Sequence, residues 1–433
     1  MKKIRPISSV FIAKLLIILL IFLLGLAIGS KFINKNTSQN SQTVERNPSQ
    51  AFISEVYDKI KENYWDNISE PALLDLFKLS IDKNGGSLTV AKFENKEKLL
   101  KGIDDSLKGK TEEEKNKFLS SVAGSVLSSL NPAGRSGLYS QKNEEELKNK
   151  VNNVNPEKDL YKDLGLEKGA SSKQIADAYQ KLSSELKKDS SPEAQQKLKE
   201  IVYARDVLSK ADTKQRYDVA KVEPTFFTQI IQPGVLYFQF KKFSPTSYDE
   251  FIKSFESYKD NASLHSLIFD LRGNIGGAID ATPYFLGNFI GKGQYAYDFY
   301  HKGDYLPFKT PTEKLASIAK YKQVVVLIDG DSQSSAEIMA ASFKKFHIGV
   351  VIGEHTKGWG TVERVFPIDN QFSDKEKYSL FLVHSITLRD DNQPIEGRGV
   401  DPDIKISDPN WQSQLLQYFN NPALVTSVAS LTK

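Results

Sequence analysis

The sequence predicts an α/β core with a mixed, largely parallel sheet and flanking helices. An N-terminal helical region, a small all-α module and a single N-terminal transmembrane helix precede this core. Three observations support this fold class. After Pro224, continuous apolar runs alternate with segments of helical periodicity, which is the pattern of a parallel sheet. In two earlier stretches, residues 51–152 and 153–222, apolar residues recur at helical spacing and no strand pattern is seen. A charge-free apolar run of fifteen residues occupies positions 15–29.

The apolar run, extended back to Ser9, has about the twenty residues that a membrane-spanning helix needs. Lys2, Lys3 and Arg5 precede it, so the positive-inside rule places the N-terminus in the cytoplasm. A cleaved signal peptide is the alternative, although residues 27–29 form only a weak cleavage site. We expect a single-pass anchor in the cell membrane within residues 1–31. A polar linker follows at residues 32–50, and the rest of the chain lies outside the cytoplasm.

Length, charge and composition exclude several kinds of architecture, site and partner. A chain of 433 residues is too long for one ordinary domain. The absence of cysteine excludes disulfides, thiolate metal sites and cysteine nucleophiles. Residues 1–31 hold five basic residues and no acidic ones, which leaves 53 basic and 54 acidic residues in the remainder. This near-neutral body predicts no nucleic-acid partner. The five histidines lack metal-ligand spacing, and we expect neither metal nor cofactor.

The two helical stretches are predicted from their apolar spacing. The first, residues 51–152, is the N-terminal helical region. The second, residues 153–222, contains a helix over 171–188 with Ser171 or Ser172 as its N-cap, and a second helix that begins at Pro192. The predicted apolar faces of the first stretch are Phe52, Val56, Ile60 and Tyr64; Leu73, Leu76 and Phe77; Leu99, Leu100, Ile103 and Leu107; and Phe118, Val122, Val126 and Leu130.

Residues 225–410 form the predicted α/β core, and residues 411–433 a C-terminal segment. A helix that ends at Phe289 is expected to have Thr282 as its N-cap and Pro283 at its first position. The expected strands are 235–240, 266–271, 323–328, 348–352 and 380–385, and the other expected helices are 247–258 and 336–346.

Three loops that follow predicted strands carry polar and glycine residues: 272–277, 329–337 and 353–360. Ligands and substrates bind beyond the carboxyl ends of strands in α/β sheets, so these loops are the candidate site. Taken singly, each has a simpler explanation. A serine at a helix start is usually an N-cap, and a Gly-Gly pair is usually a turn. No loop has the glycine–lysine–serine/threonine ending of a P-loop.

Taken together and in this order, the loops resemble those of the C-terminal processing peptidases, also called tail-specific proteases. These are serine peptidases with a Ser–Lys dyad. Residues 267–277 (LIFDLRGNIGG) resemble their "LILDLRxNxGG" segment, and residues 331–337 (DSQSSAE) are similar to "GSASASE". Residues 351–363 (VIGEHTKGWGTVE) resemble "VxGExTFGKGxVQ". Further similar segments are 55–65, 387–404 and, more weakly, 130–139.

The resemblance implies that Ser334, three residues before Glu337, is the nucleophile. A serine hydroxyl must lose its proton to a nearby base before it attacks an acyl carbon. The resemblance also implies an oxyanion hole formed by the backbone N–H of Ser335 and that of Gly276 or Gly277, because glycine permits close backbone approach.

The expected base is where this sequence departs from the family motif. Trp359 stands where the motif has its lysine, and Glu363 stands where the motif has glutamine. Lys357 is two residues earlier, and in an extended segment it would face the same side as residue 359. His355 is a second substitute, and a site without any base is the third possibility. Glu363 is expected to orient the base or to pair with its charge.

Residues 159–218 resemble the J domain of chaperone cofactors and stand where the family normally has a PDZ domain. Residues 170–182 (ASSKQIADAYQKL) are similar to the J-domain "ASxEEIKKAYRKL". The His-Pro-Asp tripeptide of J domains is replaced by residues 187–189 (KKD). We therefore expect no chaperone partner, and a spacer or substrate-docking role for this J-like module (residues 153–222).

These observations predict a membrane-anchored serine endopeptidase that cleaves exported or envelope polypeptides through an acyl-enzyme on Ser334, with a lysine-type base. The alternative is a catalytically inactive peptidase-like protein that binds unfolded polypeptides or recruits a partner. A J-type co-chaperone is disfavoured by the lost tripeptide.

Overall fold

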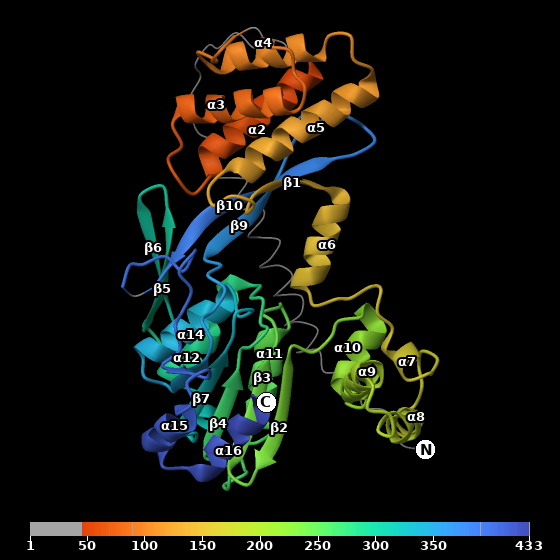
Figure 1. The fold of residues 1–433 in the computed structure, drawn as a ribbon, viewed down its shortest axis with the longest axis vertical. Coiled ribbons are helices and arrows are strands. Elements are labelled where there is room, and N and C mark those ends of the chain that lie inside the picture. The colour runs from red at the N-terminus through yellow and green to blue at the C-terminus, as the bar shows by residue number, and fades with distance from the viewer. Residues whose placement is uncertain (1–45, 89, 390, 433) are drawn as a thin grey trace, which may run out of the picture. The chain divides into compact units, whose positions relative to one another are not determined.

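The centre of the fold is a six-stranded sheet, seen in Figure 1 in a computed structural model that describes residues 46–433 except 89, 390 and 433. The strand order is β11-β8-β7-β4-β3-β2, and only β2 runs antiparallel to its neighbour. Four of the five predicted strands, namely 235–240, 266–271, 323–328 and 348–352, are therefore confirmed as parallel neighbours in this sheet. The strands are β2 (Phe226–Gln232), β3 (Val235–Phe240), β4 (Ser266–Asp270), β7 (Gln323–Ile328), β8 (Val350–Gly353) and β11 (Ile404–Lys405).

Helices cover both faces of this sheet, which explains why its central strands are continuous apolar runs. Leu267 and Phe269 of β4 pack among helices α11, α12 and α14, whereas Ile268 faces the opposite side with α15 and α16. Helix α12 begins at Thr282 itself rather than after it, and Thr282 is not the N-cap that we predicted. The helices are α11 (Ser247–Glu256), α12 (Thr282–Ile290), α13 (Ala316–Ala319), α14 (Ser335–Lys345), α15 (Trp411–Phe419) and α16 (Pro422–Leu431), with a 3-10 turn at Ile279–Ala281.

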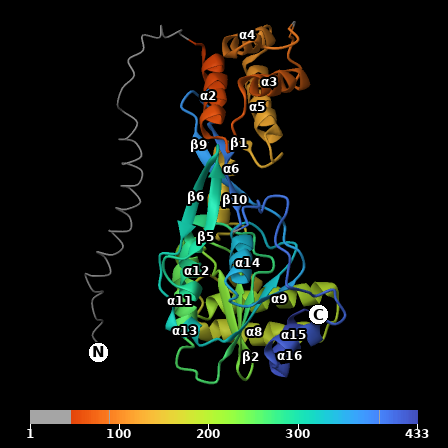
Figure 2. The same cartoon turned by 90° about the vertical axis from the view of Figure 1, so that its left-hand side faces the viewer.

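A second, antiparallel sheet lies beside the first, and Figure 2 shows its hairpin β5–β6 next to β10. The predicted strand 380–385 belongs to this sheet and is longer than expected. The hairpin itself was not predicted. Lys302 and Gly303 at its turn both have positive φ, at 51° and 101°, as a two-residue hairpin turn requires. The strands are β1 (Gly137–Ser140), β5 (Tyr295–His301), β6 (Asp304–Lys309), β9 (Thr361–Pro367) and β10 (Tyr378–Leu388).

The N-terminal helical region is a four-helix bundle whose predicted apolar faces are buried, except for the half-buried Leu76, in one cluster with Leu380 and Leu382 of β10. Asn47 caps its first helix by accepting the Gln50 N–H, and Thr111 with Glu114 forms a capping box at the start of the fourth. The helices are α2 (Pro48–Asn63), α3 (Glu70–Lys83), α4 (Lys96–Leu107) and α5 (Glu112–Ser129).

The J-like module follows helix α6 (Gln141–Val151) as an insertion whose two ends meet. Val154 and Val222 form an antiparallel bridge, and Glu223 N–H donates to Asn153 O at 3.0 Å. Helix α8 has Ser171 as its N-cap, and α9 begins at Pro192, as predicted. The module's helices are α7 (Leu160–Asp163), α8 (Ser172–Leu186), α9 (Pro192–Leu208) and α10 (Ala211–Ala220).

The predicted membrane helix lies outside the described residues, as does most of the predicted linker. Within residues 46–433 as described, no helix is both long and apolar enough to cross a bilayer.

Candidate active site

The structure brings the three predicted loops together at the carboxyl ends of β4, β7 and β8. Gly273 N–H donates to Asp329 Oδ1 at 3.0 Å, and Gln333 N–H donates to Asn274 O at 2.9 Å. These two bonds join the first loop to the second. Lys357 N–H donates to Ser332 O at 3.0 Å and joins the third loop to the second. The second loop is thus bonded to both of the other loops.

Ser334 lies immediately before helix α14 in an uncommon backbone conformation. Its φ is +56° and its ψ is −120°, a region that non-glycine residues adopt only when surrounding contacts enforce it. One such contact is the Ser334 N–H, which donates to Glu337 Oε2 at 2.8 Å. Gly276 lies so close that a Cβ added there would be 2.7 Å from Ser334 Cβ. The half-buried serine is therefore held against the glycine loop at the N-terminus of a helix.

The predicted oxyanion donors are backbone N–H groups, and the structure shows which of them already have an acceptor. Within the part of the chain that the structure describes, no protein acceptor is bonded to the N–H of Ser335 or of Gly277. Gly276 differs, because its N–H donates to Asn274 Oδ1 at 2.9 Å. Of the two glycines that the sequence offered, Gly277 is thus the one whose donor is free. Its φ is +134°, and a Cβ would meet Phe243 O at 1.9 Å, so only glycine fits.

Glu337 connects the serine to the third loop, a role that the sequence analysis missed. Its side chain is completely buried, and each carboxylate oxygen accepts two hydrogen bonds. Oε2 accepts from the N–H of Ser334 and of Trp359, both at 2.8 Å. Oε1 accepts from Thr356 Oγ1 at 2.6 Å and from Gly358 N–H at 2.7 Å. Burial raises the pKa of Glu337 and these four donors oppose that rise. The available signal was the S-x-x-E spacing at a helix start.

The structure does not bring either predicted base into contact with Ser334. The Lys357 side chain is exposed, and its ammonium group makes no hydrogen bond or ion pair with the residues described. His355 is also exposed, and its Nδ1 lies 2.9 Å from Asp401 Oδ1. This contact lowers the pKa of Asp401. Both side chains would have to reorient before they could accept the serine proton.

Trp359 occupies the lysine position of the motif with a well-fixed side chain. Its indole Nε1–H donates to Glu363 Oε1 at 3.2 Å, and Thr361 Oγ1 donates to the same oxygen at 2.5 Å. The guanidinium carbon of Arg135 lies 3.4 Å from the centre of the indole ring. Burial raises the pKa of Glu363. Glu363 therefore orients a tryptophan here, where it was expected to orient a base.

The first loop is anchored by a salt bridge that starts at the end of β4. Asp270 is completely buried and accepts hydrogen bonds from Arg272 Nε and Nη2 and from Tyr237 OH. Arg272 Nη1 also donates to Leu431 O at 2.9 Å. Helix α16 is thereby tied to the loop that supplies Gly277.

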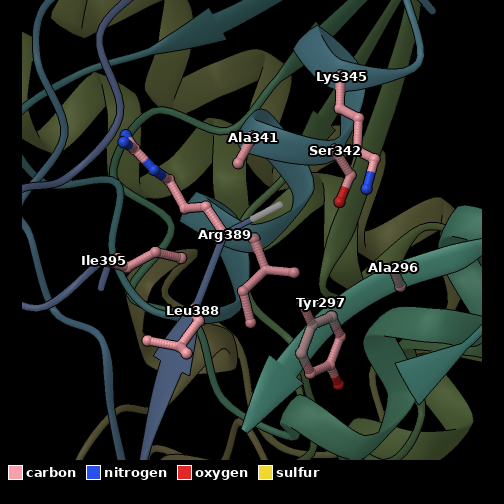
Figure 3. Close-up of a pocket in the computed structure, with 9 residues that line it drawn as sticks. Ala296, Tyr297, Ala341, Ser342, Lys345, Leu388, Arg389 and Ile395 are labelled. Carbon is pink, nitrogen blue, oxygen red and sulfur yellow. The ribbon is translucent and has the colours of Figure 1, made fainter. Parts of the chain in front are cut away.

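A small crevice separates the far end of α14 from the end of β10 (Figure 3). Ala341, Ser342 and Lys345 of α14 line one side, and Leu388 and Arg389 line the other, with Tyr297 of β5 at its base. Its volume of about 10 Å³ is enough for a single water molecule. Among the residues described, no group of three or more histidine and carboxylate side chains could hold a metal ion.

Comparisons with known proteins agree with this geometry. Residues 234–406 match Peptidase family S41, and residues 159–218 match the DnaJ domain. A "probable CtpA-like serine protease" of Staphylococcus epidermidis is 29% identical over 202 residues, which is 47% of this chain and 39% of that protein. A "carboxy-terminal-processing protease" of Bartonella bacilliformis is 26% identical over 202 residues, which is 46% of this chain and 44% of that protein. The chain thus spans less than half the length of these relatives.

Among solved structures, a photosystem II D1 C-terminal processing protease aligns with a TM-score of 0.49 and 10% identity. The alignment covers 83% of this chain and 94% of that one. The two matched segments coincide with the α/β core and with the J-like module described above. The chain therefore contains a segment of Peptidase family S41 at residues 234–406 and a DnaJ-domain segment at residues 159–218, and its similarity to the two proteases agrees with the resemblance to the C-terminal processing peptidases.

Proposed function

We propose that this protein is a serine endopeptidase that cleaves polypeptides through an acyl-enzyme on Ser334. The observation that carries the proposal is the position of Ser334 before α14 and against Gly276, while the N–H groups of the adjoining residues Ser335 and Gly277 have no protein acceptor among the residues described. Two preorganised donors at a helix N-terminus stabilise the oxyanion that forms in acyl transfer. The names of the relatives, a probable serine protease and a carboxy-terminal-processing protease, support the same reaction.

In the proposed reaction, Ser334 Oγ attacks the carbonyl carbon of a peptide bond while a base takes the hydroxyl proton. The carbonyl oxygen becomes the oxyanion beside Gly277 and Ser335. The C–N bond then breaks, and the amine leaves with the proton that the base held. Water attacks the acyl-enzyme in the same manner, releases the carboxylic acid and restores the serine.

We propose Lys357 as the lysine-type base. Its backbone is bonded to Ser332, two residues before the nucleophile, and its ammonium group is not committed to any of the described carboxylates. Turning this side chain toward Ser334 would remove it from water, and desolvation favours the neutral amine that a base requires. His355 is a less favoured base than Lys357, because its side chain would first have to leave its contact with Asp401.

The alternative function is polypeptide binding without cleavage. One observation favours it: Trp359 fills the lysine position, and Arg135 and Glu363 hold its side chain. In this alternative, the same loops would bind an unfolded segment, and the J-like module would serve as a spacer or docking element.

The test is labelling by a fluorophosphonate probe, combined with proteolysis of an unfolded protein such as reduced, alkylated casein. Wild-type protein should be labelled, and Ser334→Ala should lose both labelling and proteolysis. Lys357→Met should slow both about 10²-fold or more, because a general base contributes about 10²–10⁴-fold. His355→Gln is the matched control and should remain active. Unchanged labelling of Ser334→Ala would reject the nucleophile, and an inert wild-type protein would favour the binding function.

We also propose that the protein is anchored in the cell membrane by its N-terminal apolar segment, with residues 51–433 on the outer side. Its substrates would then be exported or envelope polypeptides. Intact cells should expose the catalytic domain to added protease, and the protein should resist extraction by alkaline carbonate. Release by carbonate, or protection from protease until the cells are lysed, would contradict this topology.

A further inference from the structure

Arg135 belongs to the segment between α5 and β1, and the N-terminal bundle fixes the backbone of this segment. Asn131 O accepts hydrogen bonds from Tyr64 OH at 2.5 Å and from Trp65 Nε1 at 2.7 Å. Ser136 Oγ accepts the N–H of Val383 in β10 at 3.0 Å. Arg135 therefore projects from a rigid support that is separate from the three catalytic loops.

The guanidinium group of Arg135 contacts Trp359 of the third loop and also Glu396, which is itself bonded to that loop. Its carbon lies 3.4 Å from the centre of the Trp359 ring, which is stacking distance. Its Nε and Nη2 both donate to Glu396 Oε1, at 3.3 and 3.1 Å. The other oxygen of Glu396 accepts the N–H of Gly360 at 2.8 Å. Arg135 thus holds the side chain of Trp359 directly, and it holds the next residue through one carboxylate.

The third loop transmits these contacts to the nucleophile. The N–H of Trp359 and the N–H of Ser334 donate to the same oxygen of Glu337. A displacement of Trp359 would withdraw one of the donors that keep the buried carboxylate in place. The carboxylate in turn is a contact that fixes the backbone of Ser334.

We propose that Arg135 is a positioning residue, which holds Trp359 and Gly360 so that Glu337 keeps Ser334 in its reactive conformation. The proposal rests on the proposed function of Ser334 as a nucleophile. Arginine suits this role because a planar guanidinium can stack on an indole and donate two hydrogen bonds within its plane. A lysine at position 135 would keep the charge but could not make both contacts. The N-terminal bundle is thereby connected to the catalytic loops.

The test compares Arg135→Ala and Arg135→Lys with Arg205→Ala. Arg205 is a matched control, because it lies 4.2 Å over the Tyr179 ring and bonds to Asp206 within the J-like module. We expect fluorophosphonate labelling to slow about 10-fold or more in both Arg135 variants, the usual scale for residues that support a catalytic group. Arg205→Ala should keep the wild-type rate. Equal rates in Arg135→Ala and Arg205→Ala would overturn the proposal.

Hydrogen–deuterium exchange provides a readout that does not require activity. In Arg135→Ala, peptides covering residues 332–338 and 354–364 should exchange faster, while the J-like module should remain unchanged. Arg205→Ala should show the reverse. If wild-type protein is not labelled, the proposed function fails, and the exchange result alone decides the role of Arg135. Unchanged exchange in residues 332–338 of Arg135→Ala would reject the positioning role even in an active enzyme.

Discussion

Glu337→Gln is expected to slow fluorophosphonate labelling of Ser334 about 10²-fold, the scale of a small misplacement of a catalytic group. Both carboxylate oxygens of Glu337 accept two hydrogen bonds. A glutamine amide replaces one oxygen with an NH₂ group, which cannot accept a hydrogen bond. Whichever way the amide is turned, two of the four donors lose their acceptor, and the link between Ser334 and the third loop weakens.

The same substitution is expected to lower the free energy of unfolding by about 1–3 kcal/mol, because buried donors are left without partners. Glu250→Gln is the matched control. Glu250 is 6% exposed and also accepts four hydrogen bonds, from Arg216 Nη1, from Thr225 N–H and Oγ1, and from Thr246 Oγ1. It bonds the J-like module to the core through Arg216, and in the described part of the chain it has no hydrogen bond to any of the three loops.

Denaturant unfolding should therefore show comparable losses of stability for Glu337→Gln and Glu250→Gln, and labelling of the folded protein should separate them. Only Glu337→Gln should label slowly. Amide exchange at Ser334 and Trp359 measures the same effect without requiring activity. A folded Glu337→Gln protein with the wild-type labelling rate and wild-type exchange would show that Glu337 is not needed to join the loops.

The elements that could be predicted from the sequence are those whose burial gives a recognisable pattern of apolar residues within a short segment. Strands β3, β4 and β7 have helices or neighbouring chain on both faces, so they appear as continuous apolar runs. The order of strands and loops then places residues 272–277, 329–337 and 353–360 at one edge of the sheet. This is why the sequence could predict that Ser334, Ser335 and the pair Gly276 and Gly277 lie at one edge of the sheet, while their catalytic roles stay predictions.

Two of the missed features depend on contacts between distant residues, and a third, the local hairpin β5–β6, has only a weak turn signal. Strand β10 has a clear strand sequence, but nothing in residues 378–388 indicates that it joins a second sheet with β1, β5 and β9. The hairpin β5–β6 is rich in aromatic residues and turns at Lys302-Gly303, a weak signal beside an Asn-Gly pair. Arg135 and Trp359 are 224 positions apart in the sequence and meet only in the folded chain.

The hydrogen bonds within the site could not be predicted from the sequence either. The sequence cannot distinguish the N–H of Gly276 from that of Gly277. In the structure, Asn274 Oδ1 accepts the N–H of Gly276 and leaves that of Gly277 free. In the same way, the sequence does not show that the side chains of Trp359 and Glu363 bond to each other, although an indole N–H can only donate once it meets a carboxylate. The indole N–H donates to the carboxylate, and within residues 46–432 as described neither of these two side chains is hydrogen-bonded to Ser334.

Trp359→Lys is expected to increase fluorophosphonate labelling and casein cleavage by about 10-fold or more, since a well-placed base is worth about 10²–10⁴-fold. The backbone of residue 359 is already bonded to the carboxylate oxygen that holds Ser334. An amine at this position would occupy the place of the motif lysine. Partial burial and the charge of Arg135 would both lower its pKa and favour the neutral base, whereas Glu363 would oppose this change.

The opposing effect of Glu363 can be removed with Glu363→Gln, which also restores the glutamine of the motif. The double variant Trp359→Lys/Glu363→Gln should therefore be more reactive than Trp359→Lys alone. Trp359→Met is the matched control, because it removes the indole ring without supplying an amine. If Trp359→Met gains as much as Trp359→Lys, the indole was obstructing the site and the missing base was not the limit. If neither variant is more reactive than the wild type while Lys357→Met is inert, Lys357 already serves as the base. The tryptophan at position 359 then does not limit the reaction.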